Sequence, residues 1–505
     1  MWILDSLPPP SASSLLLSLI VVFLVWCLAH AGYNYFISPL SKVPAPLTAH
    51  LGDYWLLWQG VRFNRCFAVD ESFKAYGPIV RIASNKVAVN AVDDIQEIYR
   101  GHNYRKSDWY EGFTFDGLHN NFSTDDPKLH AFLNKWSAPP FRKENLIKGE
   151  AAARRILDQF TRRVKLSGPK LETVSLFRLL ALDMMGAIVL GCDFRQVETG
   201  QTHPCVSDID RFMIDKQLCS YLPGWLYWTL RQIPLKPLRN VFESGPRFLK
   251  YAAELYDDAV ADDDSEQLNI LSNLKNFVDP KTGESPPEKL VISQAAAFLF
   301  AGADTTTVSL VYICWEIART PRVYTILRAA LEEAIPDPDT IPGAQELKDI
   351  PYLAAVIKEG LRVWAPGQSM LERVVPAGGA VHQGIFLPAG TIIAGQAWSS
   401  HRRETTFPDP LVFRPERWLK EIDGKQAVYE DADMLATYWP FGIGLRGCIG
   451  RPLAEMELYM IIATIVRRFK IKPAAGTNET TMRPRDVFML RPSSGMCEIE
   501  FEECV

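Results

Sequence analysis

The chain has 505 residues, of which 48% are hydrophobic and 22% are charged, and its formal net charge is −5. This balance is ordinary for a globular protein with a large core and excludes a disordered chain. Without a basic surplus, nucleic acid is not expected as a partner. The length permits one large catalytic domain, because the usual domain size is only a soft guide.

The first element along the chain is an apolar segment from Ser11 to Ala31 that contains no Asp, Glu, Lys or Arg. Its length matches the roughly 20 residues that span a bilayer core, so a membrane helix is predicted. A cleaved signal peptide is the alternative, but it would want basic residues before the apolar run, where this chain has only Asp5 and three prolines. Basic residues begin at Lys42, which by the positive-inside tendency places the rest of the chain in the cytosol.

Prolines at positions 39, 44 and 46 follow the apolar segment and predict a stiff hinge over residues 38–46. The sequence therefore divides into an anchor, residues 1–37, and one body, residues 38–505. The nine cysteines are odd in number and scattered, without the spacing of zinc sites or of a disulfide framework. They are interpreted as reduced thiols that face the cytosol.

Helical periodicity dominates the body, whereas strand-like signals are few and short, so the predicted fold is mainly α with a small β part. Helices are predicted over 128–137, 151–164, 174–190, 288–319, 322–334, 350–364 and 452–469. Strands are predicted over 79–82, 86–89, 384–387 and 391–394, the last two joined by a Pro388-Ala389-Gly390 turn.

Two of these helices carry polar residues inside apolar runs. The first contains an acid and hydroxyls in the segment Ala301-Gly302-Ala303-Asp304-Thr305-Thr306. A second membrane span is the alternative interpretation of this apolar helix, but a polar cluster inside an apolar helix is more often functional. Glu359 and Arg362 are three residues apart on one helix face, which predicts an ion pair. A surface pair of little energetic value is the alternative there. A Pro415-Glu416-Arg417-Trp418 segment follows downstream.

The strongest functional signal is the loop Phe441-Gly442-Ile443-Gly444-Leu445-Arg446-Gly447-Cys448-Ile449-Gly450. Its glycines let the backbone approach a flat ligand. Cys448 directly precedes a helix with Pro452 in its first turn, so its sulfur is expected near unpaired N–H groups and the positive end of the helix dipole. These factors favour a thiolate, which an oxygen-cleaving haem iron requires, and Arg446 offers a cation for a haem propionate.

The same loop matches the dinucleotide fingerprint G-x-G-x-x-G at Gly442, Gly444 and Gly447. That match is weak without its structural context. Tyr438-Trp439-Pro440 is a poor strand end, and too little chain follows for a Rossmann half. A haem-thiolate site is therefore the preferred interpretation.

Phe441, Gly444, Arg446, Cys448 and Gly450 match every fixed position of the pattern Phe-x-x-Gly-x-Arg-x-Cys-x-Gly. The chain thereby resembles the cytochrome P-450 family of haem-thiolate monooxygenases. Within that family it resembles the eukaryotic microsomal members, and a fungal type is one interpretation. The resemblance covers nearly the whole chain and implies the cytochrome P-450 fold after one N-terminal transmembrane helix. It also implies haem b, iron protoporphyrin IX, as cofactor, with Cys448 as the proximal iron ligand and with Phe441 and Arg446 beside the haem.

The same resemblance assigns catalytic and haem-contacting residues outside the loop. Asp304 and Thr305 are implied to relay protons, and Gly302 to make room beside the haem. Arg373 is implied to bind a propionate, and His130 to contact the haem.

Two further features follow from the same comparison. Glu359 and Arg362 are implied to form a structural triad with Arg417 that holds the haem-loop region. Asn134 departs from the family pattern, which usually has a basic residue there, so Lys135 or an arginine elsewhere would have to compensate. The propionate pairing on that side stays open, and His130 is equally compatible with a core histidine.

The implied reaction inserts one oxygen atom from O2 into a lipophilic small molecule, with electrons from NADPH through a separate reductase. Aromatic residues between Trp109 and Phe122 and between Tyr221 and Trp228 favour a lipophilic substrate, although such clusters are more often ordinary packing. The anchor implies the endoplasmic reticulum membrane, with the catalytic domain on the cytosolic side. A tailoring step in secondary-metabolite biosynthesis is expected, with xenobiotic or lipid hydroxylation as alternatives.

Two other functional classes share the thiolate ligand. A haem-thiolate isomerase or dehydratase would use Cys448 without O2, without NADPH and without Asp304 or Thr305. A non-enzymatic haem-binding protein would bind haem and show no turnover with any reductase.

Overall fold

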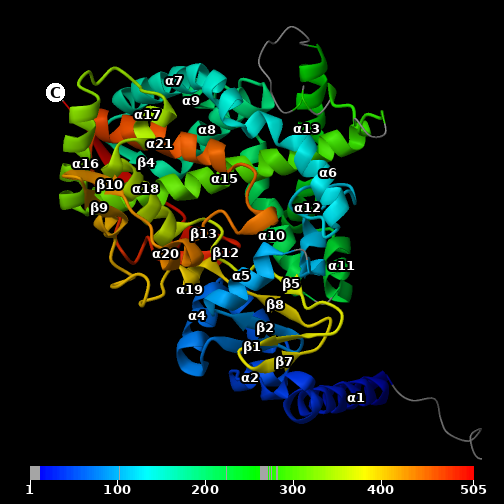
Figure 1. Ribbon diagram of the computed structural model, residues 1–505. Helices are drawn as coiled ribbons and strands as arrows, with labels where there is room; N and C mark the ends of the chain where they lie inside the picture. The colour runs from blue at the N-terminus through cyan, green and yellow to red at the C-terminus, as the bar shows by residue number, and fades with distance from the viewer. Residues whose placement is uncertain are drawn as a thin grey trace, which may run out of the picture.

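The computed structural model describes residues 12–101, 103–222, 224–261, 271, 273, 276–279 and 283–504. Helices build most of the molecule; β1, β2, β7 and β8 lie toward the end beside α1, whereas β4, β9 and β10 lie well away from it (Figure 1). The mainly α fold with a small β part is therefore confirmed. Residues 1–11, where the predicted anchor begins, lie outside the described residues.

The helices are distributed along the whole described chain. The α-helices are α1 (Ala12–Gly32), α2 (Leu47–Leu51), α3 (Tyr54–Val61), α4 (Arg65–Tyr76), α5 (Val92–Arg100), α6 (Pro127–Ser137), α7 (Lys143–Leu166), α8 (Thr173–Met185), α9 (Gln196–Thr199), α10 (Cys205–Tyr221), α11 (Gly224–Gln232), α12 (Lys236–Phe242), α13 (Ser244–Ala261), α15 (Glu288–Arg319), α16 (Pro321–Ala334), α17 (Ala344–Lys348), α18 (Pro351–Trp364), α19 (Ala397–Ser400), α20 (Ala432–Thr437) and α21 (Arg451–Arg468). Tyr33–Ile37 and Gly186–Leu190 are π-helices, and short 3₁₀ helices cover Pro39–Lys42, Asp108–Phe113, Pro139–Phe141, Pro415–Trp418 and Gly444–Arg446.

The strands are short and form several small sheets. They are β1 (Ile79–Ala83), β2 (Lys86–Val89), β3 (Arg105–Lys106), β4 (Lys170–Glu172), β5 (Arg373–Val374), β6 (Ala380–His382), β7 (Ile385–Leu387), β8 (Ile392–Ala394), β9 (Leu419–Ile422), β10 (Lys425–Val428), β11 (Phe469–Pro473), β12 (Pro484–Val487), β13 (Met489–Pro492) and β14 (Glu498–Glu503). The largest sheet has the order β1-β2-β8-β5-β3, in which only β2 and β8 are parallel.

The sequence predicts the long helices well and the strand partners less well. The helix predicted over 288–319 is α15 residue for residue. The helix predicted over 174–190 begins as α8 but continues from Gly186 as a π-helix. The strands predicted around the Pro388 turn are present as β7 and β8, yet they pair with other strands, β7 with β6 and β8 with β2 and β5.

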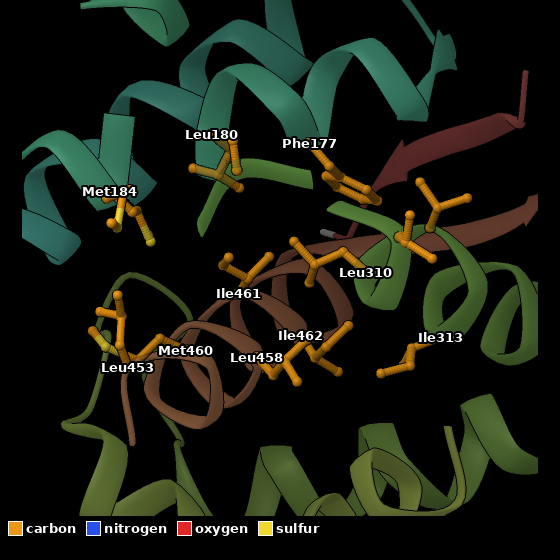
Figure 2. Close-up of a cluster of buried hydrophobic side chains, with 14 of the residues drawn as sticks. Phe177, Leu180, Met184, Leu310, Ile313, Leu453, Leu458, Met460, Ile461 and Ile462 are labelled. Atoms are coloured by element: carbon orange, nitrogen blue, oxygen red, sulfur yellow. The ribbon is translucent and has the colours of Figure 1, made fainter. Parts of the chain in front are cut away.

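The core lies where α8, α15 and α21 pack against one another, and Figure 2 shows their apolar side chains converging. Each such side chain contributes about 1.5–3 kcal/mol when it is fully buried. Because α21 directly follows the cysteine loop, this core fixes the loop relative to α15. The core residues labelled in the figure are Phe177, Leu180 and Met184 of α8, Leu310 and Ile313 of α15, and Leu453, Leu458, Met460, Ile461 and Ile462 of α21.

Three helices of the described chain are long and apolar enough to cross a membrane. Residues Leu16–Ile37 have none of their most apolar window buried, whereas Thr173–Leu190 is 83% buried and Glu288–Arg319 is 78% buried. The apolar character of α15 is thus explained by its place in the core, and the N-terminal segment is the candidate membrane anchor. It lies at the lower edge of the molecule in Figure 1.

The predicted hinge is packed against the body. Leu40 and Val43 are buried, and the fully buried Arg81 of β1 reaches the end of the apolar segment. Its Nη1 donates to the Asn34 carbonyl at 2.7 Å, and its Nη2 donates to Asn34 Oδ1 at 2.7 Å. These bonds tie the last turns of the candidate anchor to the large sheet.

Candidate functional site

The cysteine loop joins α20 to α21 and is closed by its own backbone. The Cys448 N–H donates to the Phe441 carbonyl at 2.8 Å, and the Gly447 N–H donates to the Gly444 carbonyl at 3.0 Å. Gly444 has φ +68°, and a Cβ built there would lie 2.6 Å from the Tyr99 carbonyl oxygen at the end of α5. Only glycine therefore lets the loop take this shape and this close contact.

Cys448 stands at the amino end of α21. Its side chain is accessible to solvent, yet surrounding protein makes burial the largest influence on its pKa, and the net pKa is raised. The N–H groups of Gly450 and Arg451 and the Arg451 guanidinium act in the opposite direction and lower the pKa. The predicted donors are thus present, and a bound metal cation would complete the stabilisation of a thiolate.

The middle of α15 has an accessible face within an otherwise buried helix. Ala301 is exposed and Thr305 is partly exposed, whereas most of their neighbours are buried. The two residues are four apart and share one face, and the Thr305 Oγ1 donates to the Ala301 carbonyl at 2.8 Å. This face is available to a ligand.

Gly302 lies at the contact between α15 and α8. A Cβ built on Gly302 would lie 2.7 Å from the Sδ of Met185, at the end of α8. The missing side chain therefore lets α8 and α15 pack closely.

Asp304 is fully buried and held by two arginines. Arg178 Nε lies 2.7 Å from Asp304 Oδ1, and Arg491 of β13 pairs with the other carboxylate oxygen. Both arginines also pair with Asp210 of α10, at 2.9 and 2.8 Å. Burial raises the pKa of Asp304, but the two guanidiniums outweigh it and hold the pKa below its ordinary value.

Asp304 and Thr305 consequently have different surroundings. The carboxylate faces α8, α10 and β13, whereas the hydroxyl lies on the accessible face of α15. Among the contacts of the described residues, no hydrogen bond joins the side chains of these two predicted relay residues, although they are adjacent in the sequence.

Glu359, Arg362 and Arg417 come together in the interior. Arg362 Nε lies 2.8 Å from Glu359 Oε2, and Arg417 Nε lies 3.0 Å from Glu359 Oε1. Trp418 Nε1 also donates to Glu359 at 2.9 Å. Burial raises the pKa of Glu359, and the arginine hydrogen bonds and charges bring it below its ordinary value. The pair is thus buried, and the alternative of an exposed surface pair is wrong.

His401 links this cluster to the cysteine loop, and sequence reasoning missed it. The Arg362 guanidinium donates to the His401 carbonyl at 2.8 Å, and the His401 Nδ1 lies 3.1 Å from the Arg362 carbonyl. The Trp439 N–H, two residues before Phe441, donates to His401 Nε2 at 2.9 Å. Burial lowers the pKa of His401 to about 3, so the ring is neutral. No local motif marks this residue.

Arg373 and Arg446 are both held by neutral oxygens. Arg373 donates to the Tyr110 hydroxyl at 3.0 Å and to the Glu372 carbonyl at 2.8 Å. Arg446 donates to the Thr124 and Asp125 carbonyls at 2.9 and 3.3 Å. Burial and then the charge of Arg373 lower the pKa of Arg446, so the two cations lie near each other. Within the described chain neither guanidinium has an ion pair with a carboxylate, which suits an anionic ligand.

The remaining haem-contact candidates lie on α6 and in the loop. His130 is buried and Asn134 is partly buried, whereas Lys135 is exposed. Phe441 is partly buried, and the Arg451 guanidinium lies 5.5 Å from the centre of its ring. An accessible thiol near helix N–H groups, two arginines without carboxylate partners and an accessible helix face together fit a flat, dianionic haem.

Comparison with known proteins agrees with this geometry. The cytochrome P450 family model matches residues 49–499. The cytochrome P450 monooxygenase macH of Penicillium terrestre is 30% identical, covering 92% of this chain and 93% of its own. Pisatin demethylase of Fusarium vanettenii is 28% identical, covering 87% and 85%. Tryprostatin B 6-hydroxylase of Neosartorya fischeri is 27% identical, covering 87% and 78%.

The matched region contains every part of the site, from the β3 strand to the cysteine loop and α21. Members of this family bind haem through a cysteine thiolate and use O2, a redox partner and organic substrates. With a family model over most of its length and similar fungal enzymes along nearly all of it, the chain belongs to the cytochrome P450 family and is an oxidoreductase of the monooxygenase class.

Proposed function

We propose that this enzyme inserts one oxygen atom from O2 into a lipophilic small molecule, using haem b held by Cys448. The observation that carries the proposal is the cysteine loop, in which an accessible thiol lies against the first N–H groups of α21. A bound haem supplies the activation of O2 and the transfer of one oxygen atom to carbon.

The chain's own residues hold and orient this group. Cys448 would hold the haem through its sulfur, and the Gly450 and Arg451 N–H groups would stabilise the charge of the thiolate. Arg373 and Arg446 would bind the propionates, since in the described chain their partners are neutral oxygens and not carboxylates. His130 contacts the haem from α6. The triad of Glu359, Arg362 and Arg417 keeps the cysteine loop in place through His401.

Thr305 and Asp304 move protons in this proposal. The Thr305 hydroxyl lies on the accessible face of α15, where it can pass a proton by leaving the Ala301 carbonyl. The Asp304 carboxylate can take part once it leaves Arg178 or Arg491, since both arginines have Asp210 as a second partner. General acid function here also needs water between the groups.

The substrate is proposed to be apolar and to arrive from the membrane side. Phe113 and Phe115 are 3% exposed and join an aromatic cluster that reaches Phe300 of α15. Trp225 and Trp228 of α11 are 71% and 60% exposed, as suits aromatic residues at a membrane surface. The similarity to tryprostatin B 6-hydroxylase, whose name states the hydroxylation of an organic small molecule, supports our proposal of a tailoring step in secondary-metabolite biosynthesis.

The cellular arrangement follows from the candidate span. Residues 1–37 are proposed to anchor the enzyme in the endoplasmic reticulum membrane, and residues 38–505 to form the catalytic domain on the cytosolic side. Because monooxygenases of this family use a redox partner, we propose that a separate NADPH-dependent reductase supplies the electrons.

The reduced, CO-bound difference spectrum of the purified full-length protein tests the proposal. The expected result is the thiolate-type Soret band in the wild-type protein and its loss in Cys448→Ala. Cys66→Ala is the matched control, because Cys66 is a buried thiol outside the loop. A folded, haem-loaded wild-type protein without that band would overturn the proposal. Product formation that needs both NADPH and the reductase then separates a monooxygenase from an isomerase or a haem carrier.

A further inference from the structure

The turn between β12 and β13 consists of one residue, Phe488, in an unfavourable backbone conformation. Val487 and Met489 pair with each other on either side of it. Phe488 has φ +73°, in the left-handed region that an aromatic residue rarely adopts. Such outliers cluster at ligand clamps, and they persist only where the surrounding structure holds them.

Asp486 holds this turn through hydrogen bonds to three segments of the chain. It is 5% exposed, and its Oδ1 accepts from the Phe488 N–H at 3.1 Å and from the Ser369 hydroxyl. Its Oδ2 accepts from the Cys66 N–H of α4 at 2.9 Å, and its own N–H donates to the Phe63 carbonyl at 2.9 Å. Hydrogen bonds to a carboxylate are charge-assisted and therefore stronger than neutral ones. One buried residue thus fixes the turn against the start of α4 and the segment that follows α18.

The Phe488 ring contacts two other partly buried aromatic rings, those of Trp109 and Phe122. The Phe488 centroid lies 5.2 Å from that of Trp109 and 6.0 Å from that of Phe122, and the last two are 6.5 Å apart. We call these three residues the three-ring group. The buried Phe113 contacts all three rings, and its centroid lies 6.4 Å from that of Phe300 on α15. The three-ring group is thereby connected to the helix that carries the accessible face.

Aromatic rings that are held in one arrangement and keep part of their surface accessible favour an aromatic ligand. Contacts between aromatic rings stabilise a complex beyond the burial of apolar area, and a preformed site loses less entropy on binding. We propose that Asp486 is a positioning residue that holds Phe488 in its left-handed conformation, so that the three-ring group is preformed for an aromatic ring of the substrate. The inference rests on the proposed monooxygenase function.

Binding of substituted imidazoles to the full-length holoenzyme measures this preference without turnover. Neutral imidazole is a metal ligand, so its binding to haem iron shifts the Soret band and a titration gives the Kd. N-phenyl-, N-benzyl- and N-phenethylimidazole place a phenyl ring at increasing distance from the iron, and their cyclohexyl counterparts place an aliphatic ring of similar size there. We expect at least one phenyl compound to bind the wild-type protein about two- to tenfold more tightly than its counterpart, as for an aromatic pair.

Asp486→Ala should abolish this phenyl preference and leave the Kd of unsubstituted imidazole unchanged. General damage to the site would weaken both, because unsubstituted imidazole still needs an intact haem pocket. Phe488→Ala should have the same effect as Asp486→Ala. Arg485→Gln, at an exposed neighbour on β12, is the control and should keep the preference. If Asp486→Ala does not fold, Asp486→Asn keeps one carbonyl acceptor and should reduce the preference.

Two results of these titrations would overturn the proposal. An undiminished phenyl preference in the folded Asp486 variant would reject the role of Asp486. Equal affinities within all three pairs of compounds in the wild-type protein would reject the three-ring group as a site for an aromatic ring.

Alanine and glycine at position 488 test the backbone conformation itself. Glycine adopts a positive φ without strain, so Phe488→Gly should unfold at a higher urea concentration than Phe488→Ala. Val487 lies in β12, where glycine is unfavourable, so Val487→Gly should unfold at a lower urea concentration than Val487→Ala. An equal or lower midpoint for Phe488→Gly than for Phe488→Ala would show that the turn is not held in the left-handed conformation, which would overturn the proposal.

Failure of this inference is distinct from failure of the proposed function. A thiolate-type CO spectrum together with no phenyl preference in the wild-type protein would reject only the aromatic site. A wild-type protein that lacks that spectrum would reject the haem-thiolate site itself.

Discussion

Arg178 Nε and Asp304 Oδ1 form a 2.7 Å ion pair although the two residues lie 126 positions apart in the chain. Arg178 comes from α8 and Asp304 from the middle of α15. Asp210 and Arg491 close the group, so two carboxylates and two guanidiniums alternate. The buried acid beside Thr305 is thereby connected to Asp210, whose side chain is 43% exposed.

Arg178→Met should destabilise the protein at neutral pH. The pKa of Asp304 is lowered by its arginines, so the pair stabilises the fold above the ordinary carboxyl pKa near 4 and loses that effect as the pH falls through the lower folded value. Removing one partner of a buried pair costs about 3–5 kcal/mol. The midpoint of urea unfolding at pH 7 measures the effect.

A double variant provides the control for this pair. Arg178→Met with Asp304→Asn removes both charges, so it should cost less than the sum of the two single variants. Additive losses would show that the ion pair has no coupling energy, which would contradict the role assigned to Arg178.

Thr305→Ala should keep haem but uncouple the reaction. Without the hydroxyl on the accessible face of α15, electrons from NADPH should reduce O2 to hydrogen peroxide instead of supporting product formation. Product per NADPH should fall about tenfold or more, since a positioned proton donor is typically worth 10²–10⁴-fold. The measurement is the ratio of hydrogen peroxide to NADPH consumed.

Thr307→Ala is the matched control for Thr305. Thr307 also donates to the carbonyl four residues earlier, at 2.8 Å, but it is buried on another side of α15. It should leave the ratio unchanged. An equal ratio for Thr305→Ala and the wild-type protein would remove Thr305 from proton transfer.

Local sequence patterns predict the parts of this site that lie within a few residues of one another. The cysteine loop, the start of α21 and the Glu359–Arg362 pair depend on helical spacing and turn chemistry, and α15 is predicted to the residue because its apolar run is long. Only the family pattern predicts the contact of Arg417 with Glu359, since the two residues are far apart in the sequence.

The remaining parts depend on contacts that no local pattern encodes. Arg373 is held in β5 by pairing with β3, and these two strands of two residues each lie far apart in the sequence. Arg178 and Arg491 reach Asp304 from α8 and β13, and His401 joins Arg362 to Trp439 through its ring. From a single sequence, such charged residues cannot be distinguished from ordinary surface residues, because their burial and their ion-pair partners depend on the tertiary structure.

Glu359→Gln should prevent stable incorporation of haem. Glu359 is fully buried, and it accepts from Arg362, Arg417 and Trp418, so loss of its charge leaves two buried cations without their partner. The expected cost is about 3–5 kcal/mol. The ratio of Soret to protein absorbance after purification measures the loss of haem.

Glu332→Gln is the control for that change. Glu332, whose side chain is 45% exposed, forms an i,i+4 pair with Arg328 on α16, and such helix pairs at the surface contribute about 0.3–0.5 kcal/mol. Its haem content should match the wild-type value. Full haem content in Glu359→Gln would show that the buried cluster is dispensable for the loop.

Glu457 makes the stability of the enzyme depend on pH in the opposite direction from Asp304. It is buried on α21, where Thr306 Oγ1 donates to Oε2 at 2.8 Å, and no described residue bonds to Oε1. Burial raises the pKa of Glu457 to about 8. The folded state therefore holds a proton that the unfolded state has released between about pH 4.5 and 8, and stability falls by roughly 1.4 kcal/mol per pH unit across that window.

Glu457→Gln should remove this slope, because the amide keeps an acceptor for Thr306 and does not ionise. Urea midpoints at pH 6, 7 and 8 should fall for the wild-type protein and stay nearly level for the variant. Glu455→Gln is the neighbouring control: its partners Lys348 and Arg451 help to hold the pKa of Glu455 below its ordinary value, so the carboxylate is already ionised throughout this range. Its substitution should shift all three midpoints together and preserve the slope. If the wild-type and Glu457→Gln midpoints run parallel, Glu457 is ionised in the folded protein and burial beside Thr306 does not hold its proton.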